Sequence, residues 1–188
     1  AMVIEYKHIS VMLNEVLEYL SLEKGDMAVD CTFGGGGYTE AILNIIGDTG
    51  KVLAIDRDRL AIENGLEKFR NQKNLTLINN KYSEIKTIIE EAWGEGKLVD
   101  AIVMDLGLSS AQLDDRARGF SFLHDGELKM EMSGEDSQVK TIDIVNTWRQ
   151  NEIEKILREY GEERYARNIA KHIVAKRKDE KIIRTKQL

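Results

Sequence analysis

The sequence contains no proline, although average usage would place about nine in a chain of this length. This absence leaves biased ancestry and deliberate redesign both open. The single cysteine, Cys31, excludes an internal disulfide and fits a reducing compartment, so we expect a cytoplasmic protein. No apolar run approaches the roughly 18 residues that a membrane helix needs, and the first residues lack the basic segment of a signal peptide. We therefore expect neither a membrane span nor a secretion signal.

Charge is distributed unevenly along the chain, whose formal net charge is −6. Residues 164–186 contain nine basic and two acidic side chains, a net charge of +7, so the other residues together carry −13. A basic segment attached to an acidic body indicates a polyanionic partner. A helix whose charges are simply solvated is the alternative explanation.

Short apolar runs alternate with helical patterns through the first hundred residues. The strands that these runs predict cover residues 27–31, 51–55, 75–78 and 98–104. Helical periodicity separates them, and we expect N-caps at Ser10, Asp58 and Ser83. This alternation predicts βαβ units, and therefore an α/β fold with a parallel sheet and helices on both faces.

The alternation of strands and helices stops after residue 106. Residues 107–137 show no clear period and predict a long loop, which in a compact domain is usually functional or disordered. Three helical patterns follow, over residues 141–148, 152–160 and 162–178. The basic side chains on one face of the last pattern are Arg164, Arg167, Lys171 and Lys178. We expect a sheet domain over 1–113 and a loop-and-helix domain over 114–188.

Acidic residues and glycines follow the predicted strands at their carboxyl ends. In a parallel sheet these ends lie along one edge, where ligands bind. We therefore expect one shared site, although its residues are far apart in the sequence. The residues concerned are Asp30, the glycines at 34–37, Asp56, Tyr82 and Asp105.

The glycine turn at 34–37 leaves backbone N–H groups free at a helix N-terminus and allows a ligand to approach closely. Asp56 ends the next strand, where a carboxylate can bind both hydroxyls of a ribose. The dinucleotide pattern G-x-G-x-x-G/A fails, because Thr39 or Glu40 occupies its last position. S-adenosylmethionine has no pyrophosphate and fits better. A turn that needs its glycines only for shape is the alternative.

Two other residues of this edge have candidate roles of their own. Asp105 can face the amino group of a methyl donor or the target, or it can cap the loop that follows. Tyr82 can stack on a base, or it can be an ordinary aromatic residue at the edge. The scattered histidines and the lone cysteine give no zinc-ligand spacing, and we find neither a nucleophile elbow nor a Walker lysine. We therefore expect no metal site.

Six groups of residues form a more specific pattern. They read HISVMLNE (8–15), DCTFGGGGYT (30–39), AIDRD (54–58), MDLGLSSAQLD (104–114), RGFSF with DG (118–122 and 125–126) and YGEER (160–164). In this order they resemble the RsmH (MraW) family of small-subunit rRNA cytidine-N4 methyltransferases. The resemblance extends from His8 to about Leu188.

The resemblance implies a Rossmann-like class I methyltransferase sheet, in the strand order 3-2-1-4, followed by a helical segment. It implies an S-adenosylmethionine site that consists of Gly36, Gly37, Tyr38, Asp56, Tyr82, Asp105 and Gln112. The implied reaction methylates N4 of a cytidine in 16S rRNA of the small ribosomal subunit. Asp105 is then the candidate to orient or deprotonate the amino group, and the base must leave its stack.

Several positions depart from the family pattern. Tyr38 stands where the family usually has a histidine. Four further positions at which the family has proline are occupied here by Ser10, Arg59, Ala111 and Glu127. Two charges in the 125–133 segment are inverted, at Lys129 and Glu131. Any contribution of that segment to RNA contact or catalysis depends on what these two side chains do.

The family extends beyond the position of Leu188 and adds further strands to the sheet. Four strands alone would leave the apolar strand at 98–104 on an open edge, which invites pairing with another chain. We therefore expect a homodimer through this edge. A half-fold that binds S-adenosylmethionine without turnover is the non-enzymatic alternative, and a nicotinamide dehydrogenase is the third hypothesis.

Overall fold

The chain divides into two compact units, Ala1–Ser109 and Ser110–Leu188, and each has a hydrophobic core of its own. The structure is a computed structural model that describes residues 12–108, 112–113, 115–121, 123–132 and 139–188. Within these residues, no helix is long and apolar enough to cross a membrane. The sequence predicts the division between domains after residue 113.

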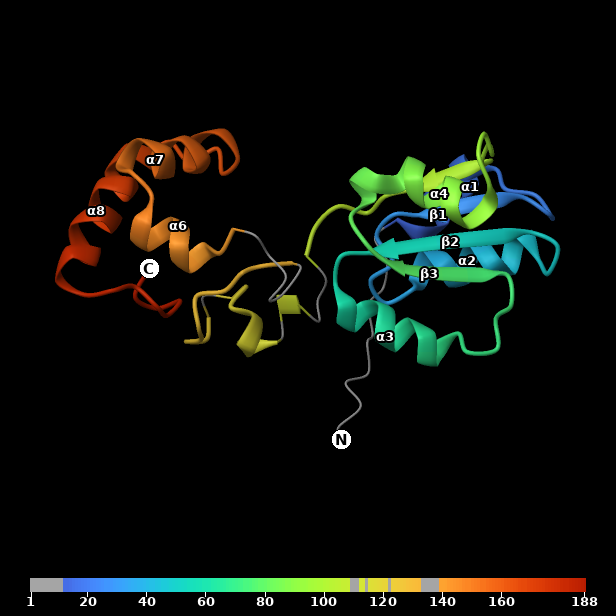
Figure 1. Cartoon of the computed structure of the whole chain (residues 1–188), viewed down its shortest axis with the longest axis horizontal. Coiled ribbons are helices and arrows are strands. Elements are labelled where there is room, and N and C mark those ends of the chain that lie inside the picture. Colours follow the sequence, from blue (N-terminus) through green and yellow to red (C-terminus); the bar gives the residue numbers. More distant parts are fainter. Residues whose placement is uncertain (1–11, 109–111, 114, 122, 133–138) are drawn as a thin grey trace. The chain divides into compact units, whose positions relative to one another are not determined.

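The first unit is built on a four-stranded parallel sheet (Figure 1). Its strands are β1 (Met27–Asp30), β2 (Lys51–Asp56), β3 (Leu75–Asn79) and β4 (Ala101–Val103). They lie in the order β3-β2-β1-β4, which confirms the α/β class and the predicted order 3-2-1-4. The two central strands, β1 and β2, are almost entirely buried, as expected for parallel strands that are covered on both faces.

The helices of this unit follow the predicted pattern, apart from one cap. They are α1 (Leu13–Leu20), α2 (Gly37–Ile46), α3 (Arg59–Lys68) and α4 (Ile85–Trp93). Asp58 caps α3 as predicted, because its carboxylate accepts the N–H of Leu60 at 3.1 Å. Ser83 does not cap α4: it lies inside a one-turn 3₁₀ helix, η1 (Tyr82–Glu84), and its hydroxyl donates to Glu84. Ser10 lies outside the described residues.

Strand β4 is shorter than the predicted span of 98–104. Leu98 is exposed in the segment before the strand, and Ile102 is the exposed residue between two buried ones. Asp100 starts the pairing with β1: its carboxylate accepts the N–H of Met27 at 2.8 Å, and its own N–H donates to the Met27 carbonyl at 2.8 Å. A polar contact therefore marks the beginning of β4, and the open edge is only three residues long.

The second unit contains the three predicted helices. They are α6 (Thr141–Thr147), α7 (Gln150–Glu159) and α8 (Ala166–Asp179), preceded by a 3₁₀ turn, η2 (Arg116–Arg118). Helix α8 begins four residues later than the pattern predicts, because Glu162 has a left-handed backbone with φ 49°. The core of the unit consists of Leu128, Val145, Ile153, Ala170, Ile173 and Ile182.

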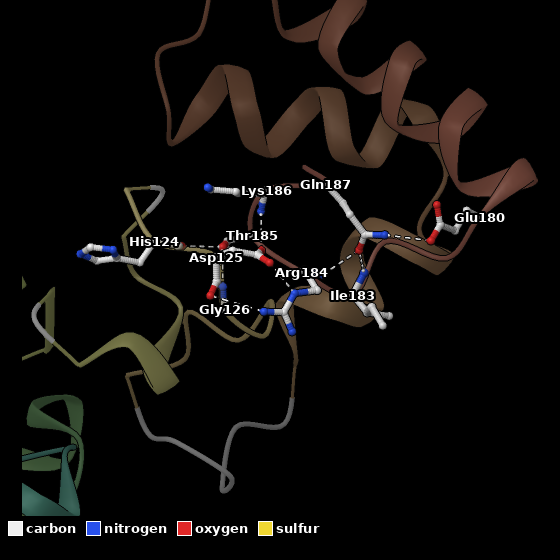
Figure 2. A network of polar contacts seen from close by, with 9 residues as sticks. All are labelled: His124, Asp125, Gly126, Glu180, Ile183, Arg184, Thr185, Lys186 and Gln187. Carbon is white, nitrogen blue, oxygen red and sulfur yellow. Dashed lines mark hydrogen bonds and ion pairs between the residues drawn. The ribbon is translucent and has the colours of Figure 1, made fainter.

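The end of the chain is held against residues 124–128 by a polar network (Figure 2). Arg184 forms an ion pair with Asp125 at 2.6 Å, which holds the pKa of that carboxyl below its ordinary value. Gly126 and Thr185 exchange two hydrogen bonds, of 2.9 and 3.0 Å. Leu128 and Ile182 are buried beside this network. Ile182 therefore belongs to the core of the second unit.

The two inverted charges, Lys129 and Glu131, both have partners. The ammonium group of Lys129 lies 2.9 Å from the carboxylate of Glu127, and this contact lowers the pKa of Glu127. The carboxylate of Glu131 accepts the N–H of Thr141, the first residue of α6, at 2.8 Å. A carboxylate at this position satisfies a free N–H group and interacts favourably with the helix dipole. Both departures from the family pattern thus have a structural role.

Replacing Glu131 with alanine is expected to destabilise the protein by about 1 kcal/mol, because the N-terminus of α6 loses its cap. Chemical denaturation measures this change. The matched control is Glu95→Ala, at an exposed turn of the first unit, which we expect to change the free energy of unfolding by less than about 0.5 kcal/mol. Equal stability of Glu131→Ala and the parent chain would contradict the capping role.

Candidate functional site

The strand register places three acids at one edge of the first unit. Asp30, the last residue of β1, is in register with Ala54 on β2 and Val103 on β4. Asp56 and Asp105 each follow two residues later along these neighbouring strands. Because adjacent strands lie about 4.8 Å apart, the backbones of β2 and β4 are separated by about 10 Å. The structure therefore brings Asp56 and Asp105 to the same edge, on either side of Asp30.

Asp56 is connected directly to the glycine turn. The N–H of Gly34 donates to Oδ2 of Asp56 at 2.7 Å, and the N–H of Asp58 donates to Oδ1 at 2.8 Å. Burial raises the pKa of Asp56, while these two hydrogen bonds oppose the change. A carboxylate has about four lone-pair sites, so Asp56 retains acceptor capacity for a ligand.

Gly36 is required by the turn for two reasons. Its φ of 77° lies in the left-handed region, at the N-cap of α2. A Cβ atom at this position would lie 2.8 Å from the ring of Phe69 and 2.9 Å from that of Phe33. These two rings contact each other edge to face, with centroids 6.0 Å apart. The two rings therefore pack directly against the backbone of the turn at Gly36. The first turn of α2 begins at Gly37, and its N–H groups lie at the carboxyl edge of the sheet.

Asp30 is the buried centre of this edge, with 0% of its surface exposed. Its carboxylate accepts the hydroxyl of Thr39 at 2.7 Å and the N–H of Thr32 at 3.1 Å. Burial raises the pKa of Asp30 to about 6, and the negative charge of Asp56 adds to the increase. The sequence predicts that Asp30 lies at this edge but indicates no role for it. The sequence signal for a buried acid of this kind is a single aspartate at the end of an otherwise apolar strand.

Thr32 joins the ends of β1 and β4. Its hydroxyl accepts the N–H of Asp105 at 2.8 Å, and its own N–H donates to Asp30. The backbone is thereby fixed at the residue where the chain leaves β4. Tyr38 lies within the field of the same acids: burial raises the pKa of its phenol, and the charges of Asp105 and Asp30 raise it further. The charges of Asp30 and Asp105 therefore both act on Tyr38.

Replacing Thr32 with valine is expected to destabilise the protein by about 1–3 kcal/mol, because the N–H of Asp105 loses its acceptor. Thr32→Ser keeps the hydroxyl and is the matched control. Thermal unfolding measures the effect on stability. If the valine and serine variants were equally stable, the hydrogen bond from Asp105 would not hold the edge together.

Two further predicted site residues are Tyr82, in the first unit, and Gln112, in the second. Tyr82 follows β3 as the first residue of η1, at the same edge of the sheet and on the far side of β2. Gln112 is buried and belongs to the second unit. Its part in a cofactor site on the first unit stays a prediction. Local periodicity could not have found Gln112, which entered only through the family resemblance.

A cavity of about 680 Å³ lies at the opposite end of the sheet. Its lining includes Lys51, Asn74 and Trp93, from the starts of β2 and β3 and the end of α4. These segments are at the amino ends of the strands, whereas ligands of such sheets bind beyond the carboxyl ends. The cavity is therefore not part of the candidate site.

Comparison with known families matches residues 5–188 to the MraW methylase family. The chain belongs to this family. The match confirms the resemblance that the six sequence motifs predict, and it extends over both units of the MraW-family chain.

Curated relatives of this MraW-family chain carry the name ribosomal RNA small subunit methyltransferase H. That of Clostridium botulinum (strain Kyoto / Type A2) is 40% identical over 184 residues, and that of Alteromonas mediterranea is 41% identical. The alignments cover 98% of this chain but only 59% and 58% of the two relatives, so the chain spans less than two thirds of their length. Among solved structures, an rRNA methylase from Streptococcus thermophilus is similar at 20% identity and a TM-score of 0.41, over 57% of this chain and 58% of that one.

Proposed function

We propose that the chain is an S-adenosylmethionine-dependent methyltransferase that acts on N4 of a cytidine in 16S rRNA. The observation that carries this proposal is the shared edge at which the glycine turn, Asp56 and Asp105 meet. The names of the two curated relatives, both small subunit rRNA methyltransferases, support the choice of substrate. A substrate in the small ribosomal subunit also implies a cytoplasmic location.

The charge of the edge favours a cationic cofactor. Asp56 contributes to the raised pKa of Asp30, and Asp105 and Asp30 both contribute to that of Tyr38. A positive charge placed at this edge would relieve the repulsion between the acids, whereas a pyrophosphate would increase it. The sulfonium and ammonium groups of S-adenosylmethionine fit this field. The same argument disfavours the nicotinamide dehydrogenase.

The residues present can hold each part of such a cofactor. Asp56 would accept the ribose hydroxyls through its remaining lone pairs. Gly36 and Gly37 would allow the amino-acid portion to approach the backbone, and Tyr82 would stack on the adenine. Tyr38 and Gln112 complete the proposed set of cofactor-binding residues.

S-adenosylmethionine, when bound, supplies a methyl group on a positively charged sulfur. The cytidine amino nitrogen is a weak nucleophile because its lone pair is delocalised into the ring. When the nitrogen takes up that methyl group, one amino proton would have to leave, and a side chain at the edge would have to accept it. We assign Asp105 to orient the amino group and to accept this proton. The base must be outside its stack to reach the site.

Transfer of a labelled methyl group to small ribosomal subunits tests the proposed activity. We expect label at cytidine N4, identified by mass spectrometry of the digested RNA. Asp105→Asn is expected to lower the rate by about 10²-fold or more, because it removes the proton acceptor. Unlabelled RNA together with intact cofactor binding would support the alternative, a cofactor-binding half-fold without turnover.

We also propose a homodimer through the open edge of β4. Ile102 and Met104 are exposed beside the free hydrogen-bonding groups of this edge strand, which is a typical site for pairing with another chain. Light scattering is expected to give twice the chain mass of 21.4 kDa. The variant Ile102→Lys should return the mass to that of one chain. A monomeric parent chain would contradict the dimer but not the proposed activity.

A further inference from the structure

Helix α8 carries a line of basic side chains on its exposed face. Arg167, Lys171 and Lys178 are all exposed and are separated by four and seven residues. At 3.6 residues per turn they lie along one side of the helix, over about 16 Å. Ala170 and Ile173, on the other side, are buried in the core of the second unit. The basic line therefore faces away from the core of the unit.

These three cations form no ion pair with any residue that the structure describes. Between residues that the structure describes, ion pairs of the second unit include those of Lys129, Lys155, Arg158 and Arg184. Like charges four residues apart, such as Arg167 and Lys171, destabilise a helix by a few tenths of a kcal/mol. An anion from outside the chain would remove this cost.

Two exposed aromatic rings precede α8 along the chain. Tyr160 is 82% exposed at the end of α7, and Tyr165 is 53% exposed at the N-cap of α8. The guanidinium of Arg164 lies 4.5 Å from the centre of the Tyr165 ring. Aromatic rings beside cations are the usual means by which proteins stack the unpaired bases of single-stranded RNA.

The distribution of charge favours a polyanion at this surface. Residues 164–186 carry a net charge of +7, while the other residues carry −13. A phosphate backbone is therefore attracted to residues 164–186, which include α8, and repelled by most of the remaining chain. We propose that the α8 surface, formed by Tyr160, Tyr165, Arg167, Lys171 and Lys178, binds a single-stranded segment of RNA. This inference rests on the proposed function and adds a docking surface for its substrate on the second unit.

Fluorescence anisotropy with an end-labelled single-stranded RNA of roughly twelve nucleotides tests this inference. The test variant replaces Arg167, Lys171 and Lys178 together with glutamine, which preserves helix propensity. We expect affinity to fall at least about tenfold, and the slope of log K against log salt to fall by about 2, since each phosphate contact contributes about 0.7. If the triple variant does not fold, the single variant Lys171→Gln replaces it. We expect this variant to lower the slope of log K against log salt by about 0.7.

The matched control replaces three exposed lysines of the first unit, Lys24, Lys73 and Lys97, with glutamine. It changes the net charge by the same amount and is expected to keep RNA affinity within about twofold of the parent. Tyr165→Ala is expected to weaken binding about tenfold, whereas Tyr165→Phe keeps the ring and the affinity. Double-stranded RNA of the same length should bind more weakly, because its bases cannot stack on the tyrosines.

Four results would overturn the inference. They are unchanged binding by the α8 variant, equal weakening in the control variant, no RNA binding by the parent chain, and equally α8-dependent binding to phosphatidylserine vesicles. Titration of the parent chain with S-adenosylmethionine distinguishes a failure of the α8 proposal from a failure of the proposed function. If the parent chain binds the cofactor but not RNA, only the α8 surface is wrong. If it does not bind the cofactor, the proposed function fails whatever the RNA result.

Discussion

Replacing Asp30 with asparagine is expected to make the protein more stable at pH 8 and to weaken its binding of S-adenosylmethionine. The asparagine side chain can keep the contacts with the N–H of Thr32, through its oxygen, and with the Thr39 hydroxyl, through its amide, although the carboxylate also accepts the backbone N–H of Thr39. It removes a negative charge that has no water around it. The charge is unfavourable for folding, but it contributes to the field that attracts a cation.

The size of the effect follows from the pKa of Asp30, which is raised from 3.8 to about 6 in the folded chain. Between these pH values the folded chain keeps a proton that the unfolded chain has lost, so the free energy of unfolding falls as pH rises. At about 1.4 kcal/mol per pH unit, the loss amounts to about 3 kcal/mol and is complete above pH 6. The stabilising effect of the asparagine is therefore expected to grow from near zero below pH 4 to about 3 kcal/mol at pH 8.

Urea denaturation of the parent and Asp30→Asn chains between pH 4 and pH 8 measures this difference. The control is Asp48→Asn, at an exposed carboxylate near the amino end of the sheet, which we expect to change the free energy of unfolding by less than about 0.5 kcal/mol. A variant that is less stable than the parent at pH 8 would mean that the ionised form of Asp30 is needed by the fold itself.

Replacing Gly36 with alanine is expected to destabilise the protein by about 3 kcal/mol and to abolish cofactor binding. A left-handed backbone costs a residue with a Cβ about 1–2 kcal/mol. The methyl group would also lie within 2.9 Å of both supporting rings, Phe33 and Phe69. Displacing well-packed rings costs a further 1–3 kcal/mol or so. Because the turn leads into α2, any shift moves the N–H groups at the edge.

Gly96→Ala is the matched control for this experiment. Gly96 also has a positive φ, of 72°, but a Cβ there would meet nothing within 4 Å. Its replacement is expected to cost only the backbone term, about 1–2 kcal/mol, and to leave cofactor affinity unchanged. Chemical denaturation and calorimetric titration of the two variants separate backbone strain from the loss of aromatic support. Equal effects at the two glycines would show that the ring pair does not determine the shape of the turn.

The sequence was sufficient to predict the sheet because its signals are local. Short apolar runs between polar turn residues define β1, β2 and β3, and the parallel arrangement follows from the helices between them. The cap at Asp58 was predictable for the same reason. The limits of β4 were not, because Leu98 looks like a strand residue until the contact of Asp100 with Met27, 73 positions away, sets the start of the strand.

The connections within the site could not be predicted from any local pattern. The hydrogen bond from Asp105 to Thr32 also spans 73 residues, and the one from Gly34 to Asp56 spans 22. Strand order brings these residues together, but only side-chain placement shows that Asp30 and Thr32 hold the edge. The role of Glu131 as a helix cap was hidden likewise, since the residue is ten positions from the N–H that it accepts.

Calorimetric titration with S-adenosylmethionine tests the central claim most directly, namely that the glycine turn and Asp56 form a cofactor site at the carboxyl edge of the sheet. The account predicts saturable binding to the parent chain, loss of binding in Asp56→Asn, retention in Asp48→Asn, and no heat with NAD. The absence of heat with S-adenosylmethionine, or equal affinity of the Asp56→Asn variant and the parent chain, would contradict it.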